Sequence, residues 1–176
     1  MIRKTVVLKE ILMDKIPCKD INVDFENISQ YIINKYIGYE FEDRNYHRDI
    51  EMGFLPDIDR IHKFLNTEFR KHQWPSLVPI DSIANVHVFL EGSYKRNHIN
   101  PFDYKKSPNL TCIVVVKGQG ELIIEHPDYK QENAFSQFSF EQGDYFIFNS
   151  DLNYFTSKNT DRNKYTQLLI NNYELI

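Results

Sequence analysis

The part of the chain after residue 80 consists of short strand-forming runs with no helical pattern between them. Turn-forming residues rich in Asn, Asp, Gly, Pro and Ser separate these runs. Short strands joined by turns pair in antiparallel sheets, since parallel pairing needs long crossover connections. The runs cover residues 83–92, 110–118, 120–126, 138–149, 154–158 and 165–173. The pattern therefore predicts a mainly β sandwich or barrel.

The first 80 residues carry the helical signal. Residues 24–38 and 56–74 have apolar side chains at helical spacing. In the second segment Ile58, Ile61, Leu65 and Phe69 fall on one face. With 176 residues, one domain is expected. We expect residues 1–80 to form a mainly helical cover that packs outside a β-barrel formed by residues 81–176.

Composition limits the possible partners. The formal net charge of −4 and the absence of a basic block argue against nucleic-acid binding. No apolar run approaches the ~18 residues of a membrane span, and the N-terminus lacks a signal-peptide core. Cys18 and Cys112 lie far apart and show no metal-binding spacing. We expect a cytoplasmic protein whose partner is a small-molecule ligand.

Two segments share a spacing that points to a site. Gly92 is followed by five residues and then by His98, Ile99 and Asn100. Gly143 opens a second segment, "GDYFIFNSDLNY", which ends at Tyr154. The spacing resembles the two motifs of the cupins, in which a second histidine stands at the position of Asn100 and a metal-binding histidine at that of Tyr154.

The same segments resemble the 2-oxoglutarate/Fe(II) oxygenases, which share the double-stranded β-helix. Their H-x-D pattern maps to His98 and Asn100, and their distal histidine to Tyr154. Their later cation before a small hydroxyl residue maps to Lys164 and Thr166, with Arg162 as the alternative. The resemblance covers about residues 83–173 and implies a jelly-roll, cupin-like barrel. It also implies Fe(II) and 2-oxoglutarate as possible cofactors.

The ligand positions are where this sequence departs from the resemblance. A non-haem Fe(II) site needs two histidines and one carboxylate. Asn100 removes the negative charge, and Tyr154 replaces an imidazole with a phenol that is neutral near pH 7. We expect the metal triad to be largely replaced, with His98 and Tyr154 facing each other across the barrel mouth. We expect Tyr154 to act there as a neutral hydrogen-bonding residue.

Other residues are candidates for refilling the site. His87 lies in phase with Phe89 and Glu91 on the predicted strand and would join His98 if that face points into the barrel. A buried histidine with one hydrogen bond explains it as well. Asp103 is close to His98 in sequence, although it also suits a turn. We treat His98, Asp103 and His87 as the candidate metal ligands. The candidate ligand-binding residues are Tyr94, Asn100, Tyr104, Tyr154, Arg162, Lys164 and Thr166.

Three functions fit the sequence. The first is a barrel that binds a small organic ligand with its metal triad replaced. The second is an active 2-oxoglutarate/Fe(II)-dependent dioxygenase with unusual ligands. The third is a non-enzymatic structural or assembly protein of phage-like origin. A homodimer is also a hypothesis, with residues 165–172 as an exposed edge strand.

Overall fold

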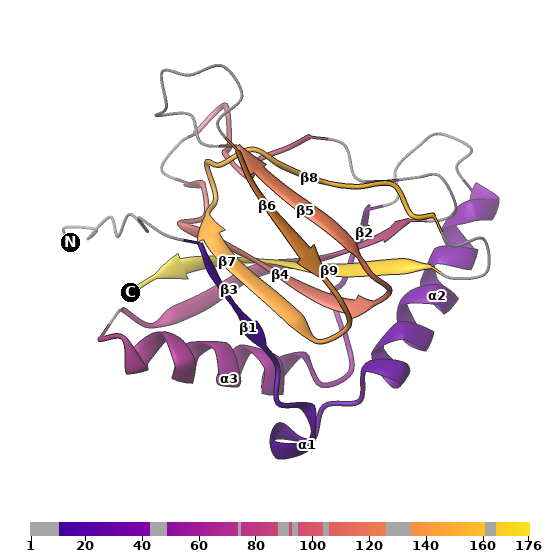
Figure 1. Cartoon of the computed structure of the whole chain (residues 1–176), viewed down its shortest axis with the longest axis horizontal. Coiled ribbons are helices and arrows are strands. Elements are labelled where there is room, and N and C mark those ends of the chain that lie inside the picture. Colours follow the sequence, from indigo (N-terminus) through magenta and orange to yellow (C-terminus); the bar gives the residue numbers. More distant parts are fainter. Residues whose placement is uncertain are drawn as a thin grey trace.

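The architecture consists of two antiparallel sheets and a set of helices. The computed structural model describes residues 11–42, 49–73, 75–87, 92, 95–103, 106–125, 135–160 and 165–176. Within them, helices cover one face of the larger sheet, and the smaller sheet covers the other face (Figure 1).

The strand order defines the fold. The larger sheet has the order β1 (Leu12–Lys15), β7 (Asp144–Asn149), β4 (Leu110–Lys117), β9 (Thr166–Leu175), β3 (Leu77–His87) and β2 (Asp49–Glu51). The smaller sheet has the order β6 (Phe135–Phe140), β5 (Gly120–Glu125) and β8 (Tyr154–Thr156). A bridge between Arg96 and Tyr154 adds the segment around residue 96 beside β8.

The chain therefore passes repeatedly from one sheet to the other, as in a jelly roll. This confirms the predicted mainly β, jelly-roll fold with helices outside. Within the described residues the strands form two facing sheets rather than one closed ring.

The central strands are apolar because both of their faces are covered. Every residue from Leu110 to Val116 on β4 is buried. On the smaller sheet, β5 alternates instead: Leu122 and Ile124 are buried, and Glu121 and Glu125 are only partly buried. A strand with one wet face needs only every second residue to be apolar. The continuous apolar run in the sequence thus indicates a strand of the larger sheet, and the alternating run indicates a strand of the smaller sheet.

The side chains between the sheets form one apolar cluster. Tyr154 belongs to this cluster and brings a hydroxyl group into it; its side chain is 1% exposed. The buried members are Ile113, Val115, Leu122, Ile124, Phe140, Phe146, Phe148, Tyr154, Leu168 and Ile170. The position of Tyr154 inside this cluster connects the core of the fold directly to the candidate site.

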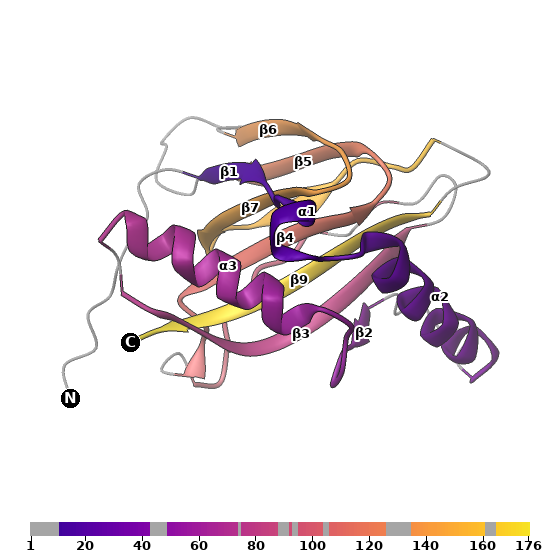
Figure 2. The same cartoon turned by 90° about the horizontal axis from the view of Figure 1, so that it is seen from below.

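The helices pack on the opposite face of the larger sheet. They are α1 (Cys18–Ile21), α2 (Phe25–Glu42) and α3 (Ile58–Lys71). Figure 2 shows α3 on one side of the larger sheet and β5 and β6 on the other. The apolar face predicted for the second helix is confirmed: Ile61, Leu65 and Phe69 are buried, and the partly buried Ile58 packs against the same core.

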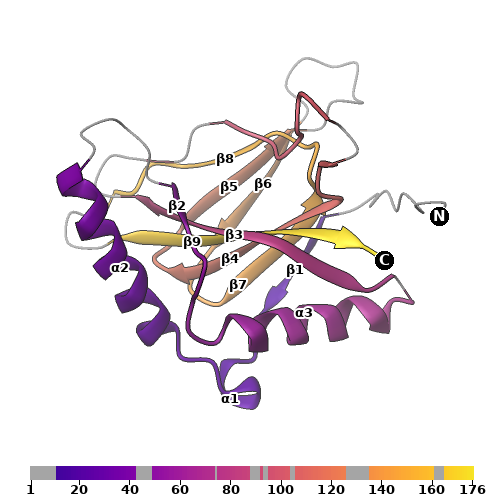
Figure 3. The ribbon, with the colours of Figure 1, turned by 180° about the vertical axis from the view of Figure 1, so that it is seen from behind.

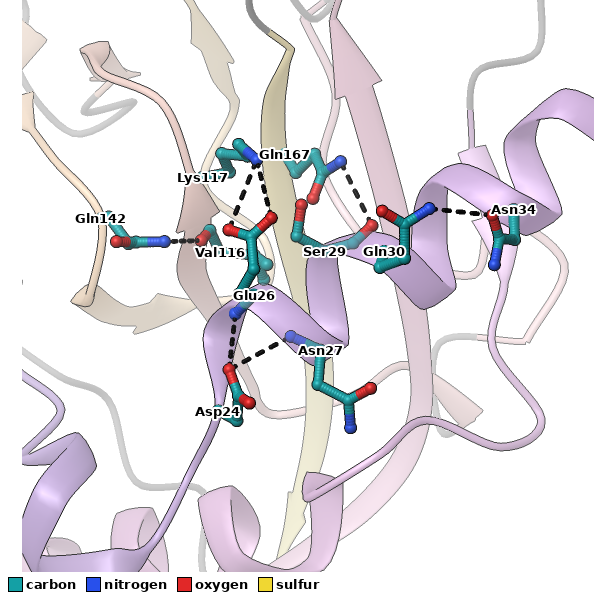
Figure 4. Close-up of polar contacts among 10 residues, drawn as sticks. All are labelled: Asp24, Glu26, Asn27, Ser29, Gln30, Asn34, Val116, Lys117, Gln142 and Gln167. Carbon is teal, nitrogen blue, oxygen red and sulfur yellow. Dashed lines mark hydrogen bonds and ion pairs between the residues drawn. The ribbon is translucent and has the colours of Figure 1, made fainter.

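Polar contacts fix the first turns of α2 against the sheet (Figure 4). The carboxylate of Asp24 accepts hydrogen bonds from the backbone N–H groups of Glu26 and Asn27, at 2.9 and 3.2 Å, and so caps the helix. Lys117 at the end of β4 pairs with Glu26 at 3.3 Å. The Gln167 amide on β9 donates to the Ser29 carbonyl at 3.5 Å. These contacts set where α2 begins, and the helix continues past Gly38 to Glu42.

The strand proposed from sequence as an exposed edge is not an edge. β9 pairs with β3 along one side and with β4 along the other (Figure 3). The prediction that residues 165–172 form a free edge for dimer contacts is therefore wrong. The residues from Thr166 to Tyr173 are all buried, as two-sided covering of a central strand requires. In the described part of the chain, no helix is long and apolar enough to cross a membrane.

A partly buried histidine makes stability sensitive to acid. The Nδ1 atom of His62 on α3 lies 2.6 Å from the Tyr173 hydroxyl oxygen. Burial lowers the pKa of His62, and the nearby Asp59 offsets part of this effect. The unfolded chain, with a histidine pKa of about 6.5, then binds more protons than the folded chain as the pH falls. The stability that the neutral His62 side chain contributes is therefore present above about pH 6.5 and is lost as the pH falls below it.

We predict that His62→Gln flattens the dependence of the unfolding free energy on pH between neutral and mildly acidic conditions. Glutamine cannot take up a proton, so the variant loses less stability on acidification than the parent does. Urea unfolding at a series of pH values measures this slope. His72→Gln, at the exposed end of the same helix, is the control. An unchanged slope in His62→Gln would contradict the assignment.

Candidate functional site

The two motif segments meet at one end of the space between the sheets. The backbones of Arg96 and Tyr154 exchange two hydrogen bonds, of 3.0 and 2.9 Å. Two residues further along, the His98 Nε2 atom lies 2.7 Å from the Tyr154 hydroxyl. The two rings are nearly parallel, with centroids 5.7 Å apart and an interplanar angle of 24°. The predicted juxtaposition of His98 and Tyr154 is confirmed.

Glycine is required at residues 92 and 143 for two different structural reasons. At Gly92 a Cβ atom would lie only 2.6 Å from the Thr156 carbonyl oxygen, so a side chain there would collide with the end of β8. Gly143 has φ of 92° in the turn before β7, a left-handed conformation that favours glycine. The shared spacing of the motifs thus reflects close approach at one glycine and turn geometry at the other.

The other nitrogen of His98 faces the larger sheet. The Asn172 side-chain amide nitrogen lies 3.3 Å from His98 Nδ1 and donates to an Asp81 carboxylate oxygen at 2.7 Å. The Asn172 carbonyl oxygen accepts from the Thr111 hydroxyl at 2.8 Å. Asn172 is the direct cross-strand partner of Asp81 on β3 and of Thr111 on β4. Directly paired residues project from the same face of a sheet, which explains the contacts.

Asp81 is the acidic end of this polar chain. The residue reaches the surface, and desolvation of its carboxyl raises its pKa. The hydrogen bond from Asn172 lowers the pKa again, and the negative charge of Glu51 raises it. The hydrogen bond matters most when the carboxyl is ionised, because an ionised acceptor forms the stronger bond.

Aromatic and cationic groups surround the Tyr154 ring. Phe148 on β7 meets it edge to face, with ring centroids 5.2 Å apart. The Arg96 guanidinium carbon lies 5.7 Å from the ring centroid. Such a position over an aromatic face is attractive for a cation. The site thus holds an arginine, an imidazole and a phenol at the end of an apolar core.

Asn100 and Asp103 are used in a turn. The Asn100 side-chain oxygen accepts from the backbone N–H groups of Phe102 and Asp103, at 3.0 and 3.1 Å. The Asp103 carboxylate lies 3.5 Å from the Lys106 ammonium group. The local role is an Asx-type turn, which fixes the loop after the His98 segment. This is the turn-forming alternative that the sequence left open for Asp103.

His87 lies deep in the protein. It is 2% exposed, its Nδ1 is 3.4 Å from the Thr156 hydroxyl, and its carbonyl accepts from the Asn159 amide. Thr166 is its direct cross-strand partner on β9 and is also buried. Among the described residues, no group of three or more His, Cys, Asp or Glu side chains is arranged to hold a metal ion. His98, Asp103 and His87 are therefore not brought together as a metal site.

Some residues of the site were not predicted from the sequence, and some of the predicted residues lie outside the described part of the chain. The sequence did not single out Asp81, Arg96, Thr111 or Asn172. Asn172 carries no clear signal, because β9 also contains Thr166, Gln167, Asn171 and Glu174 and the sequence does not show which of these polar residues face inward. The predicted residues Tyr94, Tyr104, Arg162 and Lys164 lie outside the described residues.

Two hollows in the described structure lie away from this cluster. One, of about 730 Å³, is bordered by Lys15, Glu121 and Lys158 among others. The other, of about 240 Å³, lies between α3 and β1 and is bordered by Glu68 and Tyr145 among others. None of the residues proposed for binding lines either hollow.

Comparison with known proteins places the fold. The structure resembles AviO1 from Streptomyces viridochromogenes Tue57 with a TM-score of 0.64 and 11% identity, over 91% of this chain and 86% of that one. It resembles a Pseudomonas putida prolyl-4-hydroxylase with a TM-score of 0.57 and 8% identity, over 94% and 92% of the two chains. It also resembles SnoK, a non-haem α-ketoglutarate-dependent carbocyclase from nogalamycin biosynthesis, with a TM-score of 0.62 and 9% identity, over 93% and 78%.

The chain thus has the jelly-roll fold of the 2-oxoglutarate/Fe(II) oxygenase-like proteins, as the motif spacing predicts. No family model matches the sequence, and no curated protein matches it. At such low identity the likeness concerns the fold alone. The residues described here do not fit the Fe(II) that this fold group implies, because His98 Nε2 contacts a phenol and no carboxylate completes a ligand set.

We predict that Asn100→Asp does not create a metal site, although it restores the acidic residue of the H-x-D pattern. The new carboxylate accepts the same two backbone N–H groups and stays in the turn. Isothermal titration with Mn(II) is expected to give the same weak affinity for the variant and the parent.

Asn100→Ala is the matched variant for the turn itself. It lowers the unfolding free energy by about 1 kcal/mol because the two N–H groups lose their acceptor. Tight Mn(II) binding by Asn100→Asp would show that the loop swings toward His98 and that the turn assignment is wrong.

Proposed function

We propose that this protein binds a small organic acid at the His98–Tyr154 end of the space between its sheets, and that it does so without an Fe(II) centre. The observation that carries the proposal is the contact of 2.7 Å between His98 Nε2 and the Tyr154 hydroxyl. In the motif alignment both side chains stand where metal-binding histidines would be. Here they bind each other.

The ligand chemistry argues against a resident iron. Fe(II) bound in the pattern of this fold group requires two imidazoles and a carboxylate. At the motif positions there is one imidazole, that of His98. Tyr154 would have to lose its proton inside an apolar cluster, which desolvation opposes. Asn100 and Asp103 are engaged in the turn. A single imidazole with these neighbours is a poor site for a labile metal.

The same groups suit an organic acid. Arg96 faces inward beside Tyr154, and a guanidinium binds a carboxylate through two parallel hydrogen bonds. The buried Ser150 hydroxyl has no hydrogen-bond partner among the described residues, and the Ser150 carbonyl accepts from the His98 backbone. A ligand oxygen would satisfy such a hydroxyl.

We predict that the parent protein binds Mn(II) weakly and that Tyr154→His binds it more tightly by more than about tenfold. The substitution restores a second imidazole, and loss of an outer-shell partner alone changes metal affinity by about that factor. Anaerobic titration with Fe(II) and aerobic titration with Mn(II) measure the affinities. Tyr154→Phe is the control. Tight binding by the parent that is lost in Tyr154→Phe would make the tyrosine a ligand and support an active dioxygenase.

A second prediction concerns the organic ligand. Titration of metal-free protein with succinate, pyruvate and 2-oxoglutarate is expected to show binding of at least one acid. Arg96→Gln is expected to weaken that binding by about tenfold or more, since it removes a charge-assisted hydrogen bond. Lys95→Gln is the matched control, because Lys95 is the adjacent cation and pairs with Glu125 at the surface. If the parent binds none of these acids, or only in the presence of metal, the proposal fails.

A further inference from the structure

We propose that Asp81 and Asn172 fix the tautomer of His98, so that Nδ1 accepts a hydrogen bond and the N–H group lies at Nε2. This inference deepens the proposed function, since it names the residues that turn a potential metal-binding nitrogen into a hydrogen-bond donor. It depends only on the polar contacts that run from β3 and β4 through β9 to the His98 segment.

The orientation of the Asn172 amide is the first step. An amide has one end that donates and one end that accepts. The acceptor end meets the Thr111 hydroxyl at 2.8 Å, and the donor end meets the Asp81 carboxylate at 2.7 Å. The reversed amide would place its oxygen against the carboxylate of Asp81, where two acceptors would repel each other. The two cross-strand neighbours therefore fix which end of Asn172 points toward His98.

The tautomer follows from that orientation. The Asn172 nitrogen carries two hydrogens; one points to Asp81, and the other lies toward His98 Nδ1 at 3.3 Å. A hydrogen on Nδ1 would face this N–H group, so two donors would meet. Nδ1 therefore accepts, and in the neutral imidazole the hydrogen belongs to Nε2. Nε2 then donates to the Tyr154 oxygen at 2.7 Å.

This arrangement is the reverse of the one at metal sites. A metal-ligating histidine donates its distal N–H to a carboxylate or carbonyl, which leaves the other nitrogen with a lone pair for the metal. Here the distal nitrogen meets an amide N–H instead. The lone pair is at Nδ1, and Nε2 carries hydrogen toward the phenol. The Asp81–Asn172 pair thus disfavours metal at Nε2 independently of which residue stands at position 154.

The wild-type protein provides the first test. In protein labelled with ¹⁵N in histidine, two-bond ¹H–¹⁵N correlation spectra near neutral pH distinguish the tautomers, and loss of a signal in His98→Gln assigns His98. The expected result is an unprotonated Nδ1 and a protonated Nε2. A protonated Nδ1 in the parent would overturn the inference.

A side-chain exchange provides the second test. In Asp81→Asn with Asn172→Asp, the amide on β3 donates to the carboxylate on β9, so the bond between the strands is kept. The carboxylate now faces Nδ1, and His98 is expected to switch to the Nδ1-protonated tautomer. Ser82→Ala is the control, because it breaks the neighbouring hydrogen bond of 2.7 Å to Asn171 on the helix-facing side. It is expected to leave the tautomer unchanged.

Metal affinity separates this inference from the proposed function. The exchanged pair combined with Tyr154→His is expected to bind Mn(II) about 10- to 100-fold more tightly than Tyr154→His alone. Equal affinities, or an unchanged tautomer in the exchanged pair, would refute the role of Asp81 and Asn172. Either result leaves the binding of an organic acid by metal-free protein, measured separately, as the test of the proposed function.

Discussion

The burial of both faces of β4 and β9 is the constraint on which the rest of the structure depends. Helices cover one face and the smaller sheet covers the other. A strand in this position has no water to satisfy its side chains, so each polar residue on it must have a partner. Asn172 meets this requirement by bonding to Asp81, Thr111 and His98 together. The hydrogen bonds of the site are therefore a consequence of the need to give polar side chains on the central strands a partner.

That constraint links the fold to its chemistry. The fold brings two motif segments to one end of the sandwich, as it does in proteins that hold a metal there. In this chain the residues at that end form hydrogen bonds with one another, from Asp81 at the surface to Tyr154 in the core. A connected polar chain of this kind is rigid and specific because each member limits the orientation of the next. We infer that it presents Arg96 and the phenol to an organic acid.

Much of the fold could be predicted from sequence because it is written in local patterns. The continuous apolar run at residues 110–116 marks a strand covered on both sides, and the helical spacing of Ile61, Leu65 and Phe69 marks the buried face of α3. The contact between His98 and Tyr154 followed from motif spacing. The central position of β9 could not be predicted, because a polar-rich sequence such as "TQLLINNY" is typical of an edge strand.

The rest of the candidate site depends on register, which sequence spacing does not reveal. Asp81, Thr111 and Asn172 come from three separate strands and become neighbours only through cross-strand pairing. Asn100 and Asp103 show the opposite limitation. Their sequence positions suggest ligands, yet the backbone N–H groups of the turn and the Lys106 ammonium group compete for their oxygens. Local hydrogen bonding decided their role.

The most direct test of the central claim is the metal content of the protein as the cell makes it. The full chain, expressed with added iron and purified without chelator, should be analysed for first-row transition metals by mass spectrometry. The account predicts far less than one metal ion per chain, and no more in the parent than in His98→Gln. One equivalent of iron per chain, lost in His98→Gln, would contradict it.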